Sequence, residues 1–115
     1  MGCDIHLFVE HKRGDAWVSW GRESDVCRDY DLFAKMANVR NYNGVEPISK
    51  PRGLPSDVSK TVAGISEAWD VDGHSHSWLT LDEVRSLLDH GADIERVVSD
   101  MTDCDESRVV FWFDN

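Results

Sequence analysis

Apolar and polar side chains alternate along the first ten residues. The odd positions from 3 to 9 are apolar, whereas the even positions include Asp4, His6 and Glu10. This period of two is that of a β-strand with one face against a core. A turn and a second apolar segment at residues 16–20 follow, so the pattern predicts an N-terminal hairpin.

The segment 108–113 lacks this alternation. Its sequence is Arg-Val-Val-Phe-Trp-Phe. A continuous apolar run of this length is typical of a central strand that is covered on both faces. We therefore expect another strand near the C-terminal end, lying beside the first one.

Between these strands the apolar period changes to that of helices. Positions at helical spacing predict one helix over residues 30–39. A stripe from Val58 to Trp69 predicts a second helix that begins after Ser56 or Asp57.

The third helix has the clearest start. In the segment 80–83 the Thr80 hydroxyl can accept a bond from the amide of Glu83 while the Glu83 carboxylate reaches back, which is a capping box. We expect this helix to stop at Gly91. An amphipathic pattern over residues 94–101 predicts a short fourth helix.

Together these elements predict an α+β fold in a single domain, residues 1–115. We expect a small antiparallel sheet of about three strands, made of the N-terminal hairpin and the C-terminal strand, with three to four helices packed mainly on one face. The other face would be partly open, with Asp4 and His6 on it. A symmetric homodimer could cover that face.

Two segments carry no regular period. Residues 41–56 contain three prolines and two glycines, which predicts an unusually long loop. Residues 72–77, Asp-Gly-His-Ser-His-Ser, are also interpreted as a loop before the third helix. Loops of this kind often carry function, so both are candidate locations for a site.

Composition narrows the range of partners. The 115 residues include 12 Lys and Arg against 22 Asp and Glu, a formal net charge of −10. This balance argues against non-specific binding to nucleic acids or anionic membranes, which depends on surplus positive charge. Apolar runs are too short for a membrane helix. The three widely spaced cysteines suit a reducing cytoplasm better than a disulfide scaffold.

Two pairs of side chains could bind a metal ion. Asp4 and His6 share one face of the first strand, and His74 and His76 form a similarly spaced pair. Three imidazoles and a carboxylate suit Zn²⁺ or another divalent transition metal such as Mn²⁺. The alternative is that all four side chains are ordinary hydrogen-bonded groups of a sheet face and a turn.

A second set of residues could bind an anion. Arg40 ends the first predicted helix, and Arg52 lies in a Gly/Pro-constrained segment that continues through Asp57 and Ser59 to a helix start. Arginine offers a planar fork to phosphate, and helix-start amides add partial positive charge. The alternative is that Arg40 neutralises its helix end and Arg52 pairs with a carboxylate.

Five tryptophans supply possible stacking surfaces for a base. Trp69 and Trp112 lie on apolar stripes and are expected in the core. Trp78, next to His76, is the best candidate for a binding surface.

Several blocks of sequence occur together in a recognisable combination. They are 2–6 (Gly-Cys-Asp-Ile-His), 32–40, 52–59, 74–80 and 108–115 (Arg-Val-Val-Phe-Trp-Phe-Asp-Asn). The combination resembles a family of small bacteriophage and prophage proteins with no assigned reaction. The resemblance implies an origin in the cytoplasm of infected bacteria.

Three classes of function fit these features. The first is a ligand-binding protein that sequesters a nucleotide-type, phosphate-containing signal of host defence. The second is a metal-dependent phosphoesterase built on the Asp/His cluster. The third is an acidic protein that mimics nucleic acid or blocks a basic host protein.

Overall fold

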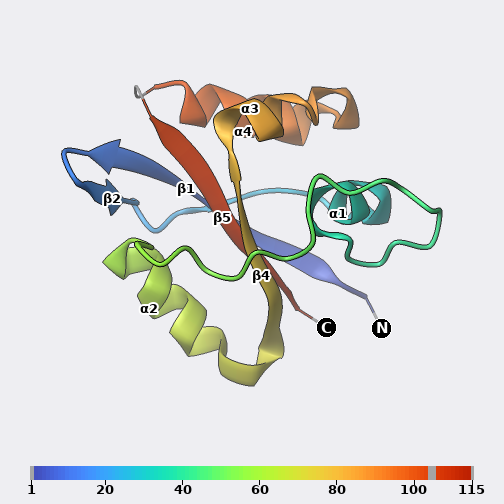
Figure 1. Ribbon diagram of the computed structural model, residues 1–115, viewed down its shortest axis with the longest axis horizontal. Helices are drawn as coiled ribbons and strands as arrows, with labels where there is room; N and C mark the ends of the chain where they lie inside the picture. The colour runs from blue at the N-terminus through green and yellow to red at the C-terminus, as the bar shows by residue number, and fades with distance from the viewer. Residues whose placement is uncertain (1, 104–105, 115) are drawn as a thin grey trace.

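The computed structural model describes residues 2–103 and 106–114 (Figure 1). The strands are β1 (Asp4–Arg13), β2 (Ala16–Val18), β3 (Glu23–Ser24), β4 (Gly73–Thr80) and β5 (Ser107–Asp114). The helices are α1 (Tyr30–Ala37), α2 (Lys60–Trp69), α3 (Leu81–Arg85) and α4 (Ala92–Met101), with 3-10 turns at Asp70–Asp72 and Leu88–His90. The predicted α+β class is confirmed.

The strands form one antiparallel sheet in the order β2-β1-β5-β4, and β3 also pairs with β1. The pairing of β1 with β5 runs from Asp4 opposite Asp114 to His11 opposite Ser107. The two ends of the chain therefore lie side by side, as Figure 1 shows. The predicted placement of the C-terminal strand beside the first one is confirmed.

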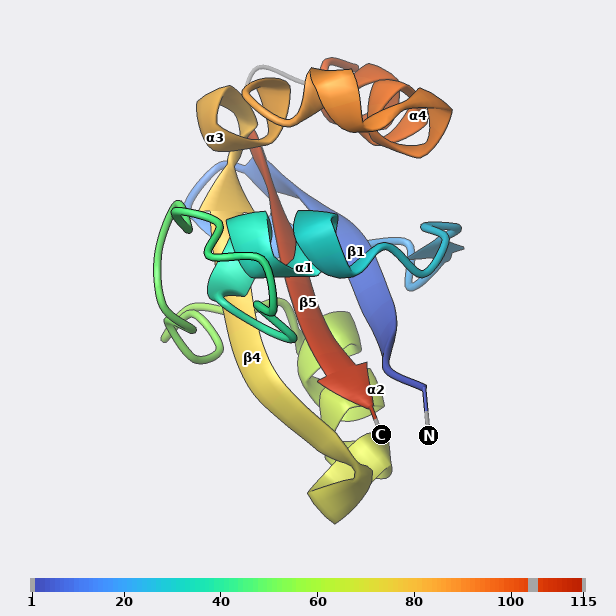
Figure 2. The same cartoon turned by 90° about the vertical axis from the view of Figure 1, so that its right-hand side faces the viewer.

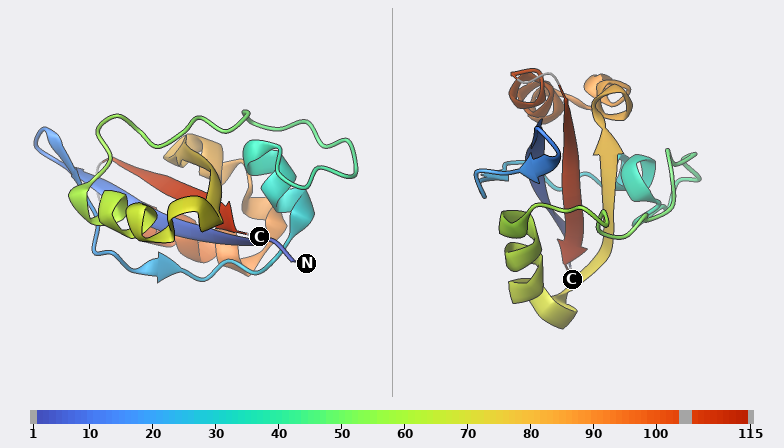
Figure 3. Two further views of the ribbon diagram at one scale, coloured as in Figure 1. Left: turned by 90° about the horizontal axis from the view of Figure 1, so that it is seen from below. Right: turned by 60° about the vertical axis from the view of Figure 1, so that its left-hand side comes forward.

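Helices cover the two faces of the sheet unequally. Figure 2 shows α1 in front of the strands and α2 behind them. The larger core joins Leu7 and Phe111 to apolar residues of α1, α3 and α4, whereas the smaller core packs Phe8 and Trp112 against α2. Three of the four helices thus share one face, as expected from the sequence, and the views in Figure 3 agree.

The sheet has more strands than the three expected, and β4 (Gly73–Thr80) includes most of the segment 72–77 that was expected to be a loop. The prediction was wrong here because the apolar alternation is interrupted. Between His74 and Ser77 the pairing with β5 shifts register, and Ser75 has φ of 55°. This bulge breaks the period of two that identifies a strand in a sequence.

Helix ends follow local capping. The first helix stops at Ala37, two residues before the predicted end, because Asn38 adopts a left-handed conformation with φ of 60°. The second begins at Lys60, since the Ser59 hydroxyl accepts a bond from the amide of Val62. The predicted capping box at the start of α3 is confirmed.

The long loop is tied to the free edge of β4. The amide of Gly53 donates to the carbonyl of His76 at 2.7 Å, and the amide of Arg52 donates to the Ser77 hydroxyl at 3.0 Å. These bonds cover part of a strand edge that would otherwise be open. Within the described residues, no helix combines the length and apolar character needed to cross a bilayer.

Candidate functional site

Asp4 and His6 lie at the end of the sheet where the two chain ends meet; Asp4 is held by an ion pair and His6 by two hydrogen bonds. Both oxygens of Asp4 accept bonds of 3.0 Å from the Arg28 guanidinium, which lowers the pKa of Asp4. The His6 ring bridges two carboxylates: Nδ1 lies 3.0 Å from Glu23 and Nε2 lies 2.8 Å from Asp114. Both ring nitrogens of His6 and both oxygens of Asp4 therefore already have partners within the protein.

The bulge in β4 separates the two remaining histidines. The His74 ring lies 6.3 Å from Phe113, which belongs to the larger core, whereas His76 stacks on Trp112 in the smaller core at 5.5 Å. The rings therefore point to opposite faces of the sheet. Burial lowers the pKa of His76, which favours its neutral form.

The four candidate metal ligands are thus not gathered in one place. Across residues 2–103 and 106–114, no group of three or more His, Cys, Asp or Glu side chains is arranged to hold an ion.

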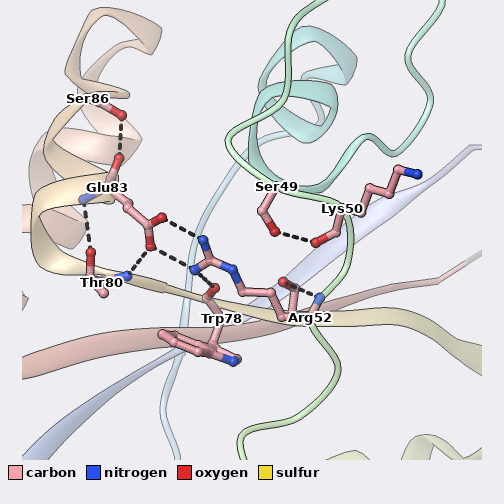
Figure 4. A network of polar contacts seen from close by, with 8 residues as sticks. Ser49, Lys50, Arg52, Trp78, Thr80, Glu83 and Ser86 are labelled. Carbon is pink, nitrogen blue, oxygen red and sulfur yellow. Dashed lines mark hydrogen bonds and ion pairs between the residues drawn. The ribbon is translucent and has the colours of Figure 1, made fainter.

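The two candidate anion-binding arginines have separate partners. Arg40 lies over the Tyr30 ring at 5.4 Å and donates to the Tyr42 hydroxyl at 3.3 Å. Arg52 makes a two-bonded pair with Glu83, at 2.8 and 2.6 Å, and donates to the carbonyl of Trp78 (Figure 4). An anion at Arg52 would have to displace the Glu83 carboxylate.

Asp57 and Ser59 belong to an ionic network on the α2 face of the sheet, which is buried at Glu10 and Arg108 and exposed at Asp57. Glu10, which is fully buried, accepts a bond of 2.7 Å from Arg108 and another of 2.8 Å from the amide of Ser59. A second nitrogen of Arg108 donates to the Asp57 carboxylate at 2.9 Å. The guanidinium stacks on the Trp17 ring at 4.0 Å, so one cation joins two strands, a helix start and an indole.

A cavity of about 500 Å³ opens beside this network. It is lined by Lys12, Trp17, Asp57, Trp78, Thr80, Leu81, Asp82, Glu106, Ser107 and Arg108. The size falls within the range of about 300 to 1,000 Å³ that is usual for small-molecule sites. We call it the tryptophan cavity.

The two indoles of the tryptophan cavity are held in place before any ligand arrives. Trp78 has the Arg52 guanidinium over its ring at 4.8 Å, and Trp17 has that of Arg108. Because both arginines are themselves fixed by carboxylates, the stacking surfaces have little freedom to lose on binding.

The sequence identified only part of this site. Trp78 and Asp57 were among the candidate binding residues, and Trp17 was one of the five tryptophans considered for stacking, whereas Lys12 and Arg108 were not candidates. A signal existed for Arg108, since it is the one charged residue in the apolar run 108–113. Such a charge is expected to have a buried partner. Comparisons with protein-family models, curated proteins and solved structures found no match to this chain.

Proposed function

We propose that the protein binds a small molecule with a flat heterocycle, of the nucleobase kind, in the tryptophan cavity. The observation that carries the proposal is the presence of two preorganised indoles, Trp17 and Trp78, in one cavity with hydrogen-bonding side chains. Base-to-aromatic stacking contributes about 1–3 kcal/mol per base and needs no particular base.

The polar groups of the cavity suit the edge of such a ring. The Asp57 and Asp82 carboxylates can accept bonds from ring N–H and amino groups, and the Thr80 hydroxyl can donate or accept. The pKa of Asp57 is lowered by its bond with Arg108, so this carboxyl group is an acceptor at neutral pH.

Charge limits the phosphate content of the ligand. Lys12 and Arg108 face three carboxylates, those of Asp57, Asp82 and Glu106, and the whole chain is strongly acidic. We infer that a nucleoside, a monophosphate or a cyclic nucleotide is favoured over a triphosphate. If the resemblance to phage proteins reflects its origin, binding without turnover would sequester such a molecule during infection.

A thermal-shift screen tests the proposal. The panel contains nucleosides, their monophosphates and triphosphates, cyclic mono- and dinucleotides and ADP-ribose. A ligand at about 100 times its dissociation constant should stabilise the native protein by about 2.7 kcal/mol. We expect Trp17→Leu and Asp82→Asn to remove the shift, whereas Trp20→Leu, a change at an exposed tryptophan outside the cavity, should leave it unchanged.

The same samples distinguish the other two classes of function. Chromatography of the ligand after incubation shows whether it is altered, and metal analysis of the purified protein shows whether Zn²⁺ or Mn²⁺ is bound. Altered ligand together with stoichiometric metal would favour the phosphoesterase. The absence of a thermal shift with every compound in the panel would overturn the proposal. If a basic host protein were then pulled down in a salt-sensitive manner, the acidic mimic would be favoured.

A further inference from the structure

The buried hydrogen-bond donors of the tryptophan cavity are already in use. All three nitrogens of the Arg108 guanidinium donate to other groups of the ionic network. The Ser107 hydroxyl donates to a backbone carbonyl at 2.8 Å. In the described part of the chain, the donors left for a ligand are chiefly the Lys12 ammonium and the Thr80 hydroxyl.

The acceptors of the cavity are less fully used. Its lining contains the carboxylates of Asp57, Asp82 and Glu106. Among the described residues, one oxygen of Asp57 accepts a bond from Arg108, and one oxygen of Asp82 accepts a long bond of 3.3 Å from Arg85. The ligand that complements this lining is therefore one with several N–H donors along one edge.

Asp57 differs from the other two carboxylates because it is fixed in position. Arg108, whose side chain is only 8% exposed, donates to the Asp57 carboxylate at 2.9 Å and to the Asp57 carbonyl at 3.3 Å. The Asp57 side chain is itself 60% exposed, so a ligand in the cavity can reach it. An acceptor that is held in place before binding loses little freedom on binding, so Asp57 is the carboxylate best suited to select a base.

The bases differ in how many donors they present side by side. The Watson–Crick edge of guanine carries the N1–H and the 2-amino group next to each other, so one carboxylate can accept two parallel bonds from it. Adenine and cytosine carry an amino group beside a ring acceptor, and uracil carries one N–H between two carbonyls. Because stacking on an indole does not discriminate among bases, these edge contacts decide the selectivity.

We propose that the tryptophan cavity is selective for guanine, with the Asp57 carboxylate accepting hydrogen bonds from the N1–H and the 2-amino group. This inference rests on the proposed nucleobase site, and it adds the identity of the base and the residue that selects it. The ionised acceptor makes this pair stronger than one between neutral groups.

Isothermal titration of the native protein with four nucleoside monophosphates tests the selectivity. Those of guanosine, inosine, adenosine and uridine carry the same phosphate, so differences in affinity report on the base. Inosine monophosphate keeps the N1–H but lacks the amino group. We expect guanosine monophosphate to bind roughly tenfold or more tightly than the adenosine and uridine compounds, with inosine monophosphate between them.

Asp57→Asn tests the residue that selects the base. The amide keeps a carbonyl oxygen for the bond from Arg108, but it offers guanine one acceptor instead of two. The preference for guanosine over adenosine monophosphate should fall to within about threefold, since a bond to a neutral group contributes less than one to a charged group. Asp89→Asn is the matched control, because it removes the same charge from an exposed residue outside the cavity and should keep the full preference.

The outcomes separate this inference from the proposed site. Equal affinities for the four compounds would overturn the guanine selectivity and leave the nucleobase site standing. A preference that survives Asp57→Asn, or that Asp89→Asn reduces equally, would overturn the role of Asp57. Binding of none of the four would count against the nucleobase site itself, and the guanine selectivity would fall with it.

Discussion

The Arg52–Glu83 pair joins three parts of the chain through a single carboxylate. Glu83 accepts bonds from Arg52 of the long loop and from the amide of Thr80 at the start of α3, and Arg52 also donates to the carbonyl of Trp78 in β4. These bonds lower the pKa of Glu83 from 4.5 to about 2. A lowered pKa means that the folded state favours the ionised form.

Stability should therefore depend on this residue above about pH 4.5 and lose that contribution as the pH falls toward 2. We expect Glu83→Gln to lower the free energy of unfolding by about 3 kcal/mol at pH 7, with a smaller difference from the native protein at pH 3. Urea denaturation at the two pH values measures both differences.

Asp82→Asn is the matched control, since Asp82 lies in the first turn of the same helix but its side chain is 92% exposed. It should cost less than about 1 kcal/mol. A loss for Glu83→Gln that is no larger than this, or one that does not diminish at pH 3, would contradict the role assigned to the pair.

The sequence could predict the local half of this arrangement. Thr80 and Glu83 are three residues apart, so their capping box follows from spacing alone. The partner of Arg52 lies 31 residues away along the chain. The contact between Arg52 and Glu83 depends on how the long loop lies against β4. The local sequence pattern does not predict that position.

The elements differ in how strongly their own sequence specifies them. The four helices and β5 were located because their period or apolar run is continuous, although α3 ends at Arg85 and not at Gly91 as expected. The strand β4 was missed because its pairing with β5, rather than its own pattern, holds it in place. Strand formation depends on neighbours more than helix formation does.

The bulge of β4 gives a prediction at the scale of an element. Ser75 has φ of 55°, a conformation that a β-branched residue adopts only with strain. We expect Ser75→Val to lower the free energy of unfolding by about 1–2 kcal/mol. Ser75→Gly should be nearly neutral, because glycine adopts the left-handed conformation without steric cost, which offsets the lost bond between the Ser75 hydroxyl and His74.

Ser75→Ala serves as the control, since it removes the hydroxyl but keeps a Cβ atom. Urea denaturation should rank the three variants with glycine the most stable and valine the least. If valine were as stable as glycine, the bulge would not impose the left-handed conformation.

At the scale of the whole molecule, the tryptophan cavity depends on contacts between distant segments. Glu10 and Arg108 are 98 residues apart, and Asp57 reaches Arg108 across 51 residues. The alternation along the first strand predicts that Glu10 lies on its more polar face. Arg108 stands out as the one charged residue of the apolar run 108–113. The sequence could not show that Glu10 and Arg108 meet, because their contact follows from the register of β1 with β5.

The net charge of −10 leads to a prediction about the whole fold. An excess of like charge destabilises a compact state, and salt screens that repulsion over about 10 Å at 0.1 M. Added salt also weakens the exposed ion pairs, but these contribute little individually. We therefore expect the free energy of unfolding to rise, by an amount on the order of 1 kcal/mol, when NaCl increases from about 0.02 M to 0.5 M.

Two charge reversals provide the internal comparison. Glu67 and Asp89 are exposed residues, and changing both to lysine moves the net charge from −10 to −6, because each reversal adds two units. If repulsion across the whole molecule limits stability, the double variant should be more stable than the native protein at low salt and less responsive to NaCl. An equal salt response in both proteins would mean that the acidic surface carries no folding penalty. The negative charge would then matter for which ligands the tryptophan cavity admits.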